Sequence, residues 1–128
     1  MNEAVRQAVE EIKAGVSPSE CEIQEDPDGG AWVLVEDVSL GDLYEPDCSW
    51  VGFRITFQYP NADVYPHFVR ADLRRKDGRP LGDGIQVNHT FLGRPALQIS
   101  RRSNRLNPQT DTALLKMLKV AKWLSTHS

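Results

Sequence analysis

The spacing of hydrophobic residues predicts a helix near the amino terminus. Five apolar residues fall at the intervals of one helix face, namely Ala4, Val5, Ala8, Val9 and Ile12. Polar and charged residues fill the positions between them, and Gly15 follows as a natural terminator. We therefore expect an amphipathic helix that ends near Gly15.

Alternating apolar and polar residues, and in one case a richness in β-branched and aromatic residues, then predict four strands of an antiparallel sheet. The clearest alternation lies in WVGFRITFQYP, where the odd-numbered residues from Val51 to Tyr59 share one face. Shorter patterns predict the other three strands, at Cys21 and Ile23, in AWVLVEDVSL from Ala31, and at Val69, Ala71 and Leu73. Turn sequences such as DPDGG separate these strands.

No regular pattern covers roughly residues 80 to 107, and a long irregular segment inside a compact domain is often functional. A second helix follows, which Asn107 or Asp111 can cap and which Pro108 suits at its first turn. Its buried face is expected to hold Leu114, Leu115, Leu118, Ala121 and Leu124, and its solvent face Lys116, Lys119 and Lys122.

This order of elements predicts one α+β domain over residues 1 to 128, and a chain of this length can bury one core. It consists of an N-terminal helix, a four-strand antiparallel meander sheet, an irregular active-site-like segment and a C-terminal helix. No apolar run approaches the length of a membrane span, and the amino terminus lacks the pattern of a signal peptide. We expect a cytoplasmic protein with no membrane partner.

The net charge of −3 conceals an asymmetry between the two halves of the chain. Residues 1–66 contain 3 basic and 14 acidic side chains, a charge of −11, whereas residues 67–128 contain 12 basic and 4 acidic, a charge of +8. Basic residues include Arg74, Arg75, Lys76, Arg101, Arg102 and Arg105. Nucleic acid is one possible partner, but few aromatic residues accompany these stretches, which disfavours it. The alternatives are an acidic protein partner and contact between the two halves.

The chain offers few groups for metal or cofactor chemistry. Cys21 and Cys48 lack the spacing of a zinc site, and we expect two free thiols. His67, His89 and His127 are far apart, with no HExxH pattern around them. The glycine-rich GRPLGDG is not followed by the Lys-Ser/Thr of a phosphate loop. We therefore expect no metal and no cofactor.

Several short motifs occur in the order found in one large family. Tyr44 and Glu45 precede the central strand, which ends at Pro60, and Tyr65-Pro66 follows. LNP at 106–108 then precedes the last helix. In these features most of the chain resembles the ubiquitin-conjugating enzymes (the UBC/RWD superfamily), although the prolines that follow Tyr-Pro in that family are absent here. The resemblance implies a UBC-like fold.

The resemblance also implies where a nucleophile would lie. In the family, a His-Pro-Asn motif comes shortly before the cysteine that carries ubiquitin as a thioester. Here His89 matches the histidine, but Thr90 and Phe91 replace proline and asparagine, and Asn88 stands on the wrong side. The place of the cysteine falls near Gln98. A thioester needs a thiolate, and a glutamine amide cannot form one.

We therefore expect a bacterial pseudoenzyme that acts as a binding or adaptor protein in a ubiquitin-like modification system. Its partner would be a ubiquitin-like protein, an activating-enzyme homologue or both. The vestigial site would contain Asn88, His89, Gln98 and Ser100, with Arg101, Arg102 and Arg105 as binding residues.

Two alternatives remain. The first is an active conjugating enzyme with Ser100 or Cys48 as the acceptor. Ser100 would need His89 as its base, although a role for His89 in bracing the loop is favoured, and the acidic neighbours of Cys48 disfavour a thiolate. The second alternative is a nucleic-acid-binding domain that uses the basic C-terminal half.

Overall fold

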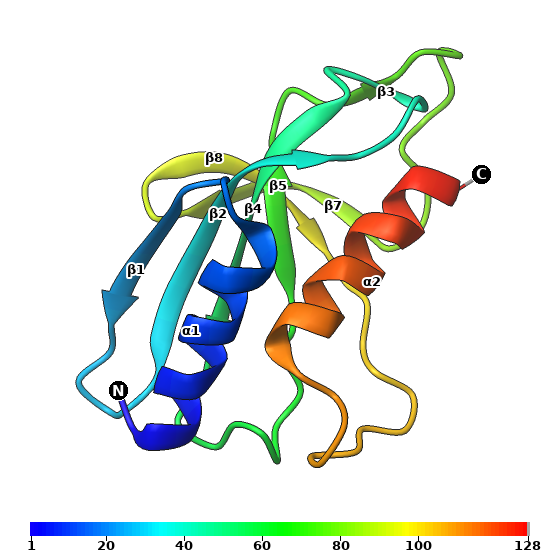
Figure 1. The fold of residues 1–128 in the computed structure, drawn as a ribbon. Coiled ribbons are helices and arrows are strands. Elements are labelled where there is room, and N and C mark those ends of the chain that lie inside the picture. The colour runs from blue at the N-terminus through cyan, green and yellow to red at the C-terminus, as the bar shows by residue number, and fades with distance from the viewer. Residues whose placement is uncertain (128) are drawn as a thin grey trace.

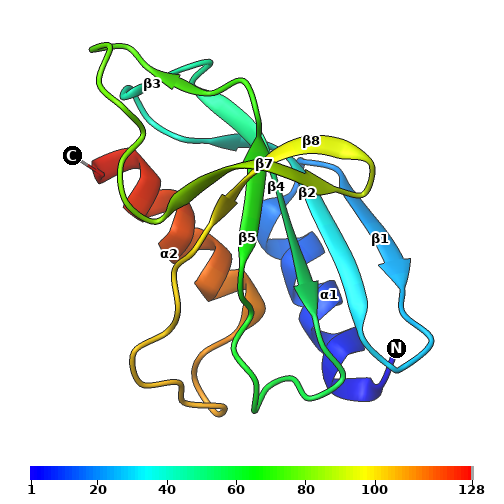
Figure 2. The ribbon, with the colours of Figure 1, turned by 180° about the vertical axis from the view of Figure 1, so that it is seen from behind.

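A computed structural model describes residues 1–127 and shows an α+β fold. Two helices lie side by side on one face of a six-stranded sheet (Figures 1 and 2). Within the described residues, neither helix has the length and apolar character that crossing a membrane requires. The main core fills the space between the helices and the sheet.

The first helix, α1 (Glu3–Val16), confirms the predicted amphipathic helix. Its buried residues are Val5, Ala8, Val9 and Ile12. Asn2 caps it by accepting a hydrogen bond from the backbone N–H of Val5 at 2.9 Å. Gly15 lies inside the last turn, where an added Cβ would sit 2.5 Å from Leu114 Cδ2. Its role is therefore to let the second helix approach α1 closely.

All neighbouring strands in the large sheet are antiparallel. Their order is β1-β2-β4-β5-β8-β7, so the first four occur in chain order. Their bounds are β1 Cys21–Glu25, β2 Ala31–Ser39, β4 Cys48–Ile55, β5 His67–Arg70, β7 Ile85–Phe91 and β8 Arg94–Ile99. A separate two-stranded sheet joins β3 (Tyr44–Glu45) to β6 (Arg74–Arg75).

The prediction of an irregular segment over residues 80 to 107 is wrong for its central part, because β7 and β8 form a hairpin there. Leu92 and Gly93 make the turn, both with positive φ (47° and 80°). β7 is an edge strand with mostly exposed or half-buried side chains, so its sequence carries little apolar alternation. Only residues 100–112 connect the sheet to the last helix.

The last helix, α2 (Ala113–Thr126), begins later than expected and turns a different face to the core. Thr112 is its N-cap, whereas Asn107 accepts a hydrogen bond from Gln109 in the turn before the helix. Leu115 and Leu118, expected in the core, are 44% and 46% exposed. The buried residues are Ala113, Lys116, Met117, Val120, Ala121 and Leu124. Lys116, which was expected on the solvent face, is among them, and its partner is described below.

Two tyrosines fix the ends of α2 to the core. The hydroxyl of Tyr44, which is fully buried, donates to the backbone carbonyl of Leu124 at 2.9 Å. The hydroxyl of Tyr59 accepts from the backbone N–H of Ala113 at 3.1 Å, which satisfies a free donor of the first turn. Burial raises the pKa of both tyrosines, so both phenols stay protonated at neutral pH.

The opposite face of the sheet carries a second, smaller hydrophobic cluster. Its members are Leu34, Phe91 and Ala96, with Trp32, Trp50, Phe68 and Leu92 packed around them. Phe91 covers Gly52 so closely that an added Cβ would lie 2.4 Å from its ring. The helices and this cluster therefore enclose the central strands from both sides.

Candidate anion-binding site

Two residues of the expected vestigial site, Gln98 and Ser100, lie together at the end of β8. The Ser100 hydroxyl donates to Gln86 Oε1 at 2.5 Å and accepts from Gln98 Nε2 at 3.3 Å. Both partners are neutral amides, and neither can remove the hydroxyl proton as a base. Where the resemblance implies a nucleophilic cysteine, the chain therefore has a hydrogen-bonded amide.

The other two expected residues, Asn88 and His89, lie further along the β7–β8 hairpin. His89 pairs with Ala96, whereas the Ser100 N–H bonds to the carbonyl of Gly84. Four residues along a strand separate Ala96 from Ser100, which is about 13 Å at the usual rise. A general base must come within about 3 Å of the proton it removes, so His89 does not serve Ser100. Its ring instead lies 6.3 Å from that of Phe68.

Asn88 has φ of +66° and lies where the pairing of β7 with β8 shifts register between Gln86 and His89. The position fits a backbone role, because asparagine tolerates the left-handed region. The structure therefore joins Gln98 and Ser100 by a hydrogen bond, whereas among the described residues neither Asn88 nor His89 makes a side-chain hydrogen bond to either of them.

Both cysteines are free thiols, and each is half-buried. Burial raises the pKa of Cys21, which keeps that thiol protonated and unreactive. Cys48 opens β4 at the rim of a separate hollow of about 470 Å³ that Arg70 and Trp50 also line. The start of β8, at Arg94 and Pro95, lines the same hollow, but Gln98 and Ser100 do not.

A buried polar network ties the segment after β8 to α2. Lys116 Nζ donates to both carboxylate oxygens of Asp63 at 3.1 and 3.2 Å and to Ser103 Oγ at 2.8 Å. The N–H and hydroxyl of Ser103 donate to the same carboxylate at 2.7 and 2.8 Å. Lys116 is only 8% exposed, so this pairing is what permits its burial. The Ser103 hydroxyl is fully engaged and is not a free nucleophile.

The network sets the ionisation of two groups. Burial alone would raise the pKa of Asp63, but hydrogen bonds from Ser103 and Lys116 outweigh it and hold that pKa below its usual value. His67 is fully buried on β5, and neither of its ring nitrogens has a hydrogen-bond partner. Burial, and secondarily the charge of Lys116, lowers the pKa of His67 to about 3. The imidazole is therefore neutral. Residues 1–127 contain no cluster of His, Cys, Asp and Glu fit to hold a metal ion.

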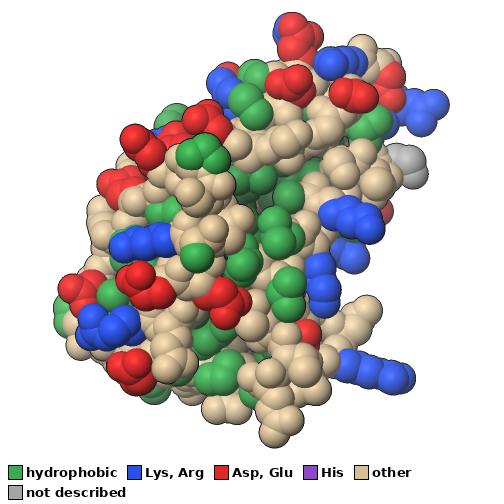
Figure 3. All heavy atoms as spheres, in the orientation of Figure 1, with side chains coloured by type: hydrophobic (Ala, Val, Ile, Leu, Met, Phe, Trp, Pro, Cys, Tyr) green, Lys and Arg blue, Asp and Glu red, His purple; other side chains and the backbone are tan. Residues whose placement is uncertain are grey.

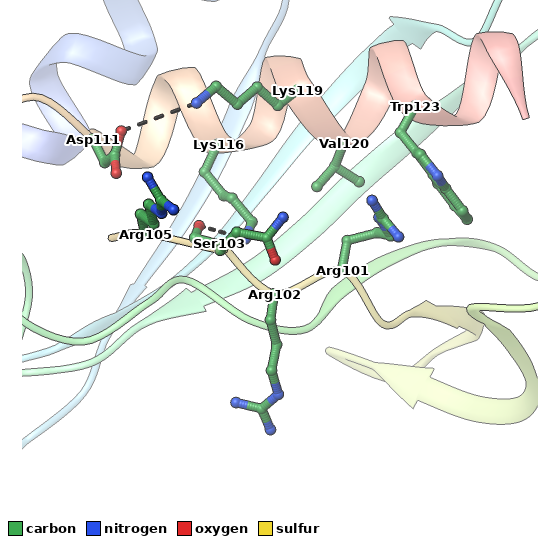
Figure 4. Close-up of a pocket in the computed structure, with 10 residues that line it drawn as sticks. Arg101, Arg102, Ser103, Arg105, Asp111, Lys116, Lys119, Val120 and Trp123 are labelled. Atoms are coloured by element: carbon green, nitrogen blue, oxygen red, sulfur yellow. Dashed lines mark hydrogen bonds and ion pairs between the residues drawn. The ribbon is translucent and has the colours of Figure 1, made fainter. Parts of the chain in front are cut away.

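Above this network, residues 101–105 and α2 enclose a hollow of about 350 Å³ (Figure 4). Arg101 lies beside Trp123 at one end, and Arg105 lies toward Asp111 at the other. Arg102 extends away from α2, and its guanidinium lies 4.1 Å from the ring centre of Tyr65. We call this hollow the cationic pocket. Its polar and apolar lining includes Arg101, Arg105, Lys119, Asp111, Val120 and Trp123.

The charges of the cationic pocket are largely uncompensated. Seven of the ten arginines have a carboxylate oxygen within 3.9 Å, namely Arg6, Arg54, Arg70, Arg74, Arg75, Arg79 and Arg94. Among residues 1–127, the three without one are Arg101, Arg102 and Arg105. The nearest paired carboxylate oxygen of Lys119 is Asp111 Oδ1, which lies 4.0 Å from its Nζ. The chain thus leaves positive charge in one concave place, which favours an anionic ligand.

Trp123 gives the pocket its apolar end. The Arg101 guanidinium lies 4.8 Å from the indole centre, and the His127 imidazole stacks on the same side chain at 4.2 Å. A stacked guanidinium keeps its in-plane N–H groups free to bind a carboxylate or phosphate. Sequence reasoning identified the arginines but missed Trp123, Lys116 and Asp63. The sequence did contain one signal for Lys116. It follows Ala113 by three positions, which places it on the same helix face as that apolar residue.

The RRK stretch that motivated a nucleic-acid role is largely used inside the fold. Arg75 is 7% exposed, pairs with Asp77 at 2.9 Å and donates to the backbone carbonyl of His127 at 2.7 Å. Arg74 pairs with Glu45 across the small sheet at 3.5 Å. Arg74 and Arg75 therefore do not add unpaired charge to that of Arg101 and Arg105.

Comparison of the chain with protein-family models, with curated proteins and with solved structures finds no match to any of them.

Proposed function

We propose that this protein is a non-catalytic, UBC-like binding domain in a ubiquitin-like modification system. It would act as an adaptor that holds a ubiquitin-like protein or an activating-enzyme homologue without forming a covalent bond. Support comes from the order of elements, in which a helix precedes four strands adjacent in chain order and a further helix ends the domain. The motifs at Tyr44-Glu45 and Tyr65-Pro66 also support the proposed relation to the UBC-like family.

One observation carries the proposal, namely an uncompensated cationic pocket directly after a strand end that has no nucleophile. Gln98 cannot carry an acyl group, and Ser100 hydrogen-bonds to amides rather than to a base. Arg101 and Arg105, by contrast, are free to bind an anionic partner. Opposite charges on a partner would steer association and fix its orientation.

The test combines the protein with a ubiquitin-like protein of the same organism, its activating enzyme and ATP. We expect a non-covalent complex by size-exclusion chromatography, weakened by salt and by Arg101→Gln with Arg105→Gln. On a non-reducing gel we expect no adduct. A thiol-sensitive adduct lost in Cys48→Ala, or a hydroxylamine-sensitive one lost in Ser100→Ala, would replace the proposal with an active conjugating enzyme.

Nucleic-acid binding is a second candidate, because Arg101, Arg102 and Arg105 have no carboxylate partner in the described chain and could meet phosphates. Its signature is binding of single-stranded oligonucleotides that falls steeply with added salt. Absence of binding at low salt would remove it.

A further inference from the structure

The outer face of α2 is both apolar and basic. Leu115 and Leu118 are among the most exposed large hydrophobic residues of the described chain. They share one helix surface with Lys119 and Lys122, because residues three, four and seven positions apart lie on the same side. We call these four residues the α2 ridge. In Figure 3, hydrophobic side chains gather over the two helices, and Lys and Arg side chains border them toward the α2 side.

The α2 ridge adjoins the cationic pocket. Lys119 belongs to both, because it lines the pocket and lies one helical turn from Leu115. A molecule bound in the pocket would therefore meet two exposed leucines where it leaves past Lys119. The combined surface offers two guanidiniums, an ammonium and two exposed leucine side chains.

We propose that the cationic pocket and the α2 ridge together bind an acidic polypeptide segment that carries apolar side chains. Carboxylates of the segment pair with Arg101, Arg105 and Lys119, and its apolar side chains cover Leu115 and Leu118. This inference rests on the proposed function in taking the chain as a binding domain, and it adds the site and the chemistry of the partner.

Charge and geometry favour a polypeptide over a single-stranded nucleic acid at this surface. A nucleic acid supplies anions but has no aliphatic side chains to cover the leucines of the α2 ridge. Base stacking would need an open aromatic face, yet Trp123 already carries Arg101 at 4.8 Å and His127 at 4.2 Å. The ring of Tyr65 is likewise occupied by Arg102 at 4.1 Å. The nearby aromatic rings are therefore used within the chain.

The arginine pairing pattern supports an acidic partner in the same way. Arg54, Arg70 and Arg94 each meet a carboxylate of this chain, so the fold pairs its arginines wherever it can. The segment that contains Arg101 and Arg105 is anchored at Ser103 by hydrogen bonds to Asp63, yet within the described chain neither arginine has a carboxylate partner. Holding two unpaired guanidiniums on an anchored segment is the arrangement expected of a site whose carboxylates come from a partner.

The experiment measures fluorescence anisotropy with three labelled probes. The first is a short peptide of Asp, Glu and Leu, the second is the same peptide with every Leu replaced by Ser, and the third is oligo(dT) of equal net charge. The protein variants are Arg101→Gln with Arg105→Gln, and Leu115→Ser with Leu118→Ser. Arg74→Gln with Arg79→Gln is the matched control, because it removes two charges, as the double arginine variant does, from exposed arginines outside the surface.

We expect the leucine-containing peptide to bind best. The double arginine variant should weaken it by about tenfold or more, since each lost charge-assisted contact is worth a sizeable fraction of that factor. The double leucine variant should weaken that peptide severalfold while leaving the serine peptide unchanged. The control with Arg74→Gln and Arg79→Gln should leave all affinities as they are. Thermal unfolding of each variant confirms that it is folded.

Three results would overturn the inference. They are tighter binding of oligo(dT) than of the leucine peptide, peptide binding that the arginine variants do not change, and no peptide binding at all. Self-association of the protein that disappears in the arginine variants would also overturn it, by making the acidic half of a second copy the occupant. The probes contain no modifier or activating enzyme, so failure here differs from failure of the proposed function, which shows as a covalent adduct or as no complex with the modifier.

Discussion

Acidification is expected to destabilise the protein through one buried side chain, His67. Its folded-state pKa is about 3, against an ordinary value of 6.5. Below pH 6.5 the unfolded chain binds a proton that the folded protein does not, so the stability contributed by the neutral imidazole is complete above pH 6.5. It is lost progressively as the pH falls from 6.5 toward 3.

The size of the effect follows from the pKa difference. Each pH unit below 6.5 costs about 1.4 kcal/mol of unfolding free energy, so lowering the pH to about 4.5 costs about 3 kcal/mol. That is a large share of the 5 to about 15 kcal/mol typical of a domain. His67 is fully buried and packs 5.1 Å from Phe53, so solvent does not screen the proton it would take up.

The assay compares urea unfolding of the wild type with that of His67→Phe at neutral pH and at about pH 4.5. Phenylalanine keeps an aromatic ring against Phe53 and removes two ring nitrogens that lack partners. The variant should therefore be as stable as the wild type at neutral pH, or more so, because an unpaired buried polar atom is costly. It should lose about 2 to 3 kcal/mol less than the wild type on acidification.

Carboxylates whose pKa is lowered, such as Asp63 and Asp77, also lose stabilisation as the pH falls through their folded pKa. They do so in both proteins, so the difference between wild type and variant isolates the imidazole. Equal losses in the two proteins would refute the assignment of the acid sensitivity to His67. A variant with lower stability at every pH but a smaller pH dependence would still support it.

Two further substitutions test the packing around the site and the sheet. Lys116→Met should destabilise the protein by about 2 to 3 kcal/mol in chemical denaturation, because it leaves the Asp63 carboxylate partly buried without its cation; an unchanged midpoint would show that the pair contributes little. Gly52→Ala should cost about 1 to 3 kcal/mol, because the new Cβ would meet the ring of Phe91 and shift the tryptophan emission of the cluster around it; wild-type stability with unchanged emission would contradict this packing.

Prediction from the sequence succeeded where the local residue pattern is enough to identify the buried face of an element. α1 shows this, because its four buried residues follow the helix period. β4 follows the period-two alternation that predicted it, and β2 contains the β-branched and aromatic residues that predicted it; both lie inside the sheet. The strand predicted to continue to Tyr59 ends at Ile55, and Phe57 beyond it is 51% exposed. The alternation of apolar residues therefore continues past the last residue that pairs with a neighbouring strand.

Prediction failed where distant partners decide the outcome. The buried face of α2 includes Lys116, whose ammonium pairs with Asp63, a residue 53 positions earlier in the chain. No periodicity within the helix reports that pairing. β7 was missed because an edge strand has one neighbour and little buried surface. In the candidate site, Arg101 and Arg105 could be identified from the sequence. Their lack of carboxylate partners could not, because it depends on where the fold places every carboxylate.

The register shift in β7 has a consequence for how copies of the protein meet. β7 ends the large sheet, and a straight strand there would offer a continuous row of backbone donors and acceptors to another chain. The left-handed turn of the backbone at Asn88 breaks that row in mid-strand. Molecules at high concentration are thereby hindered from joining sheet to sheet, which protects this border of the fold against fibril growth.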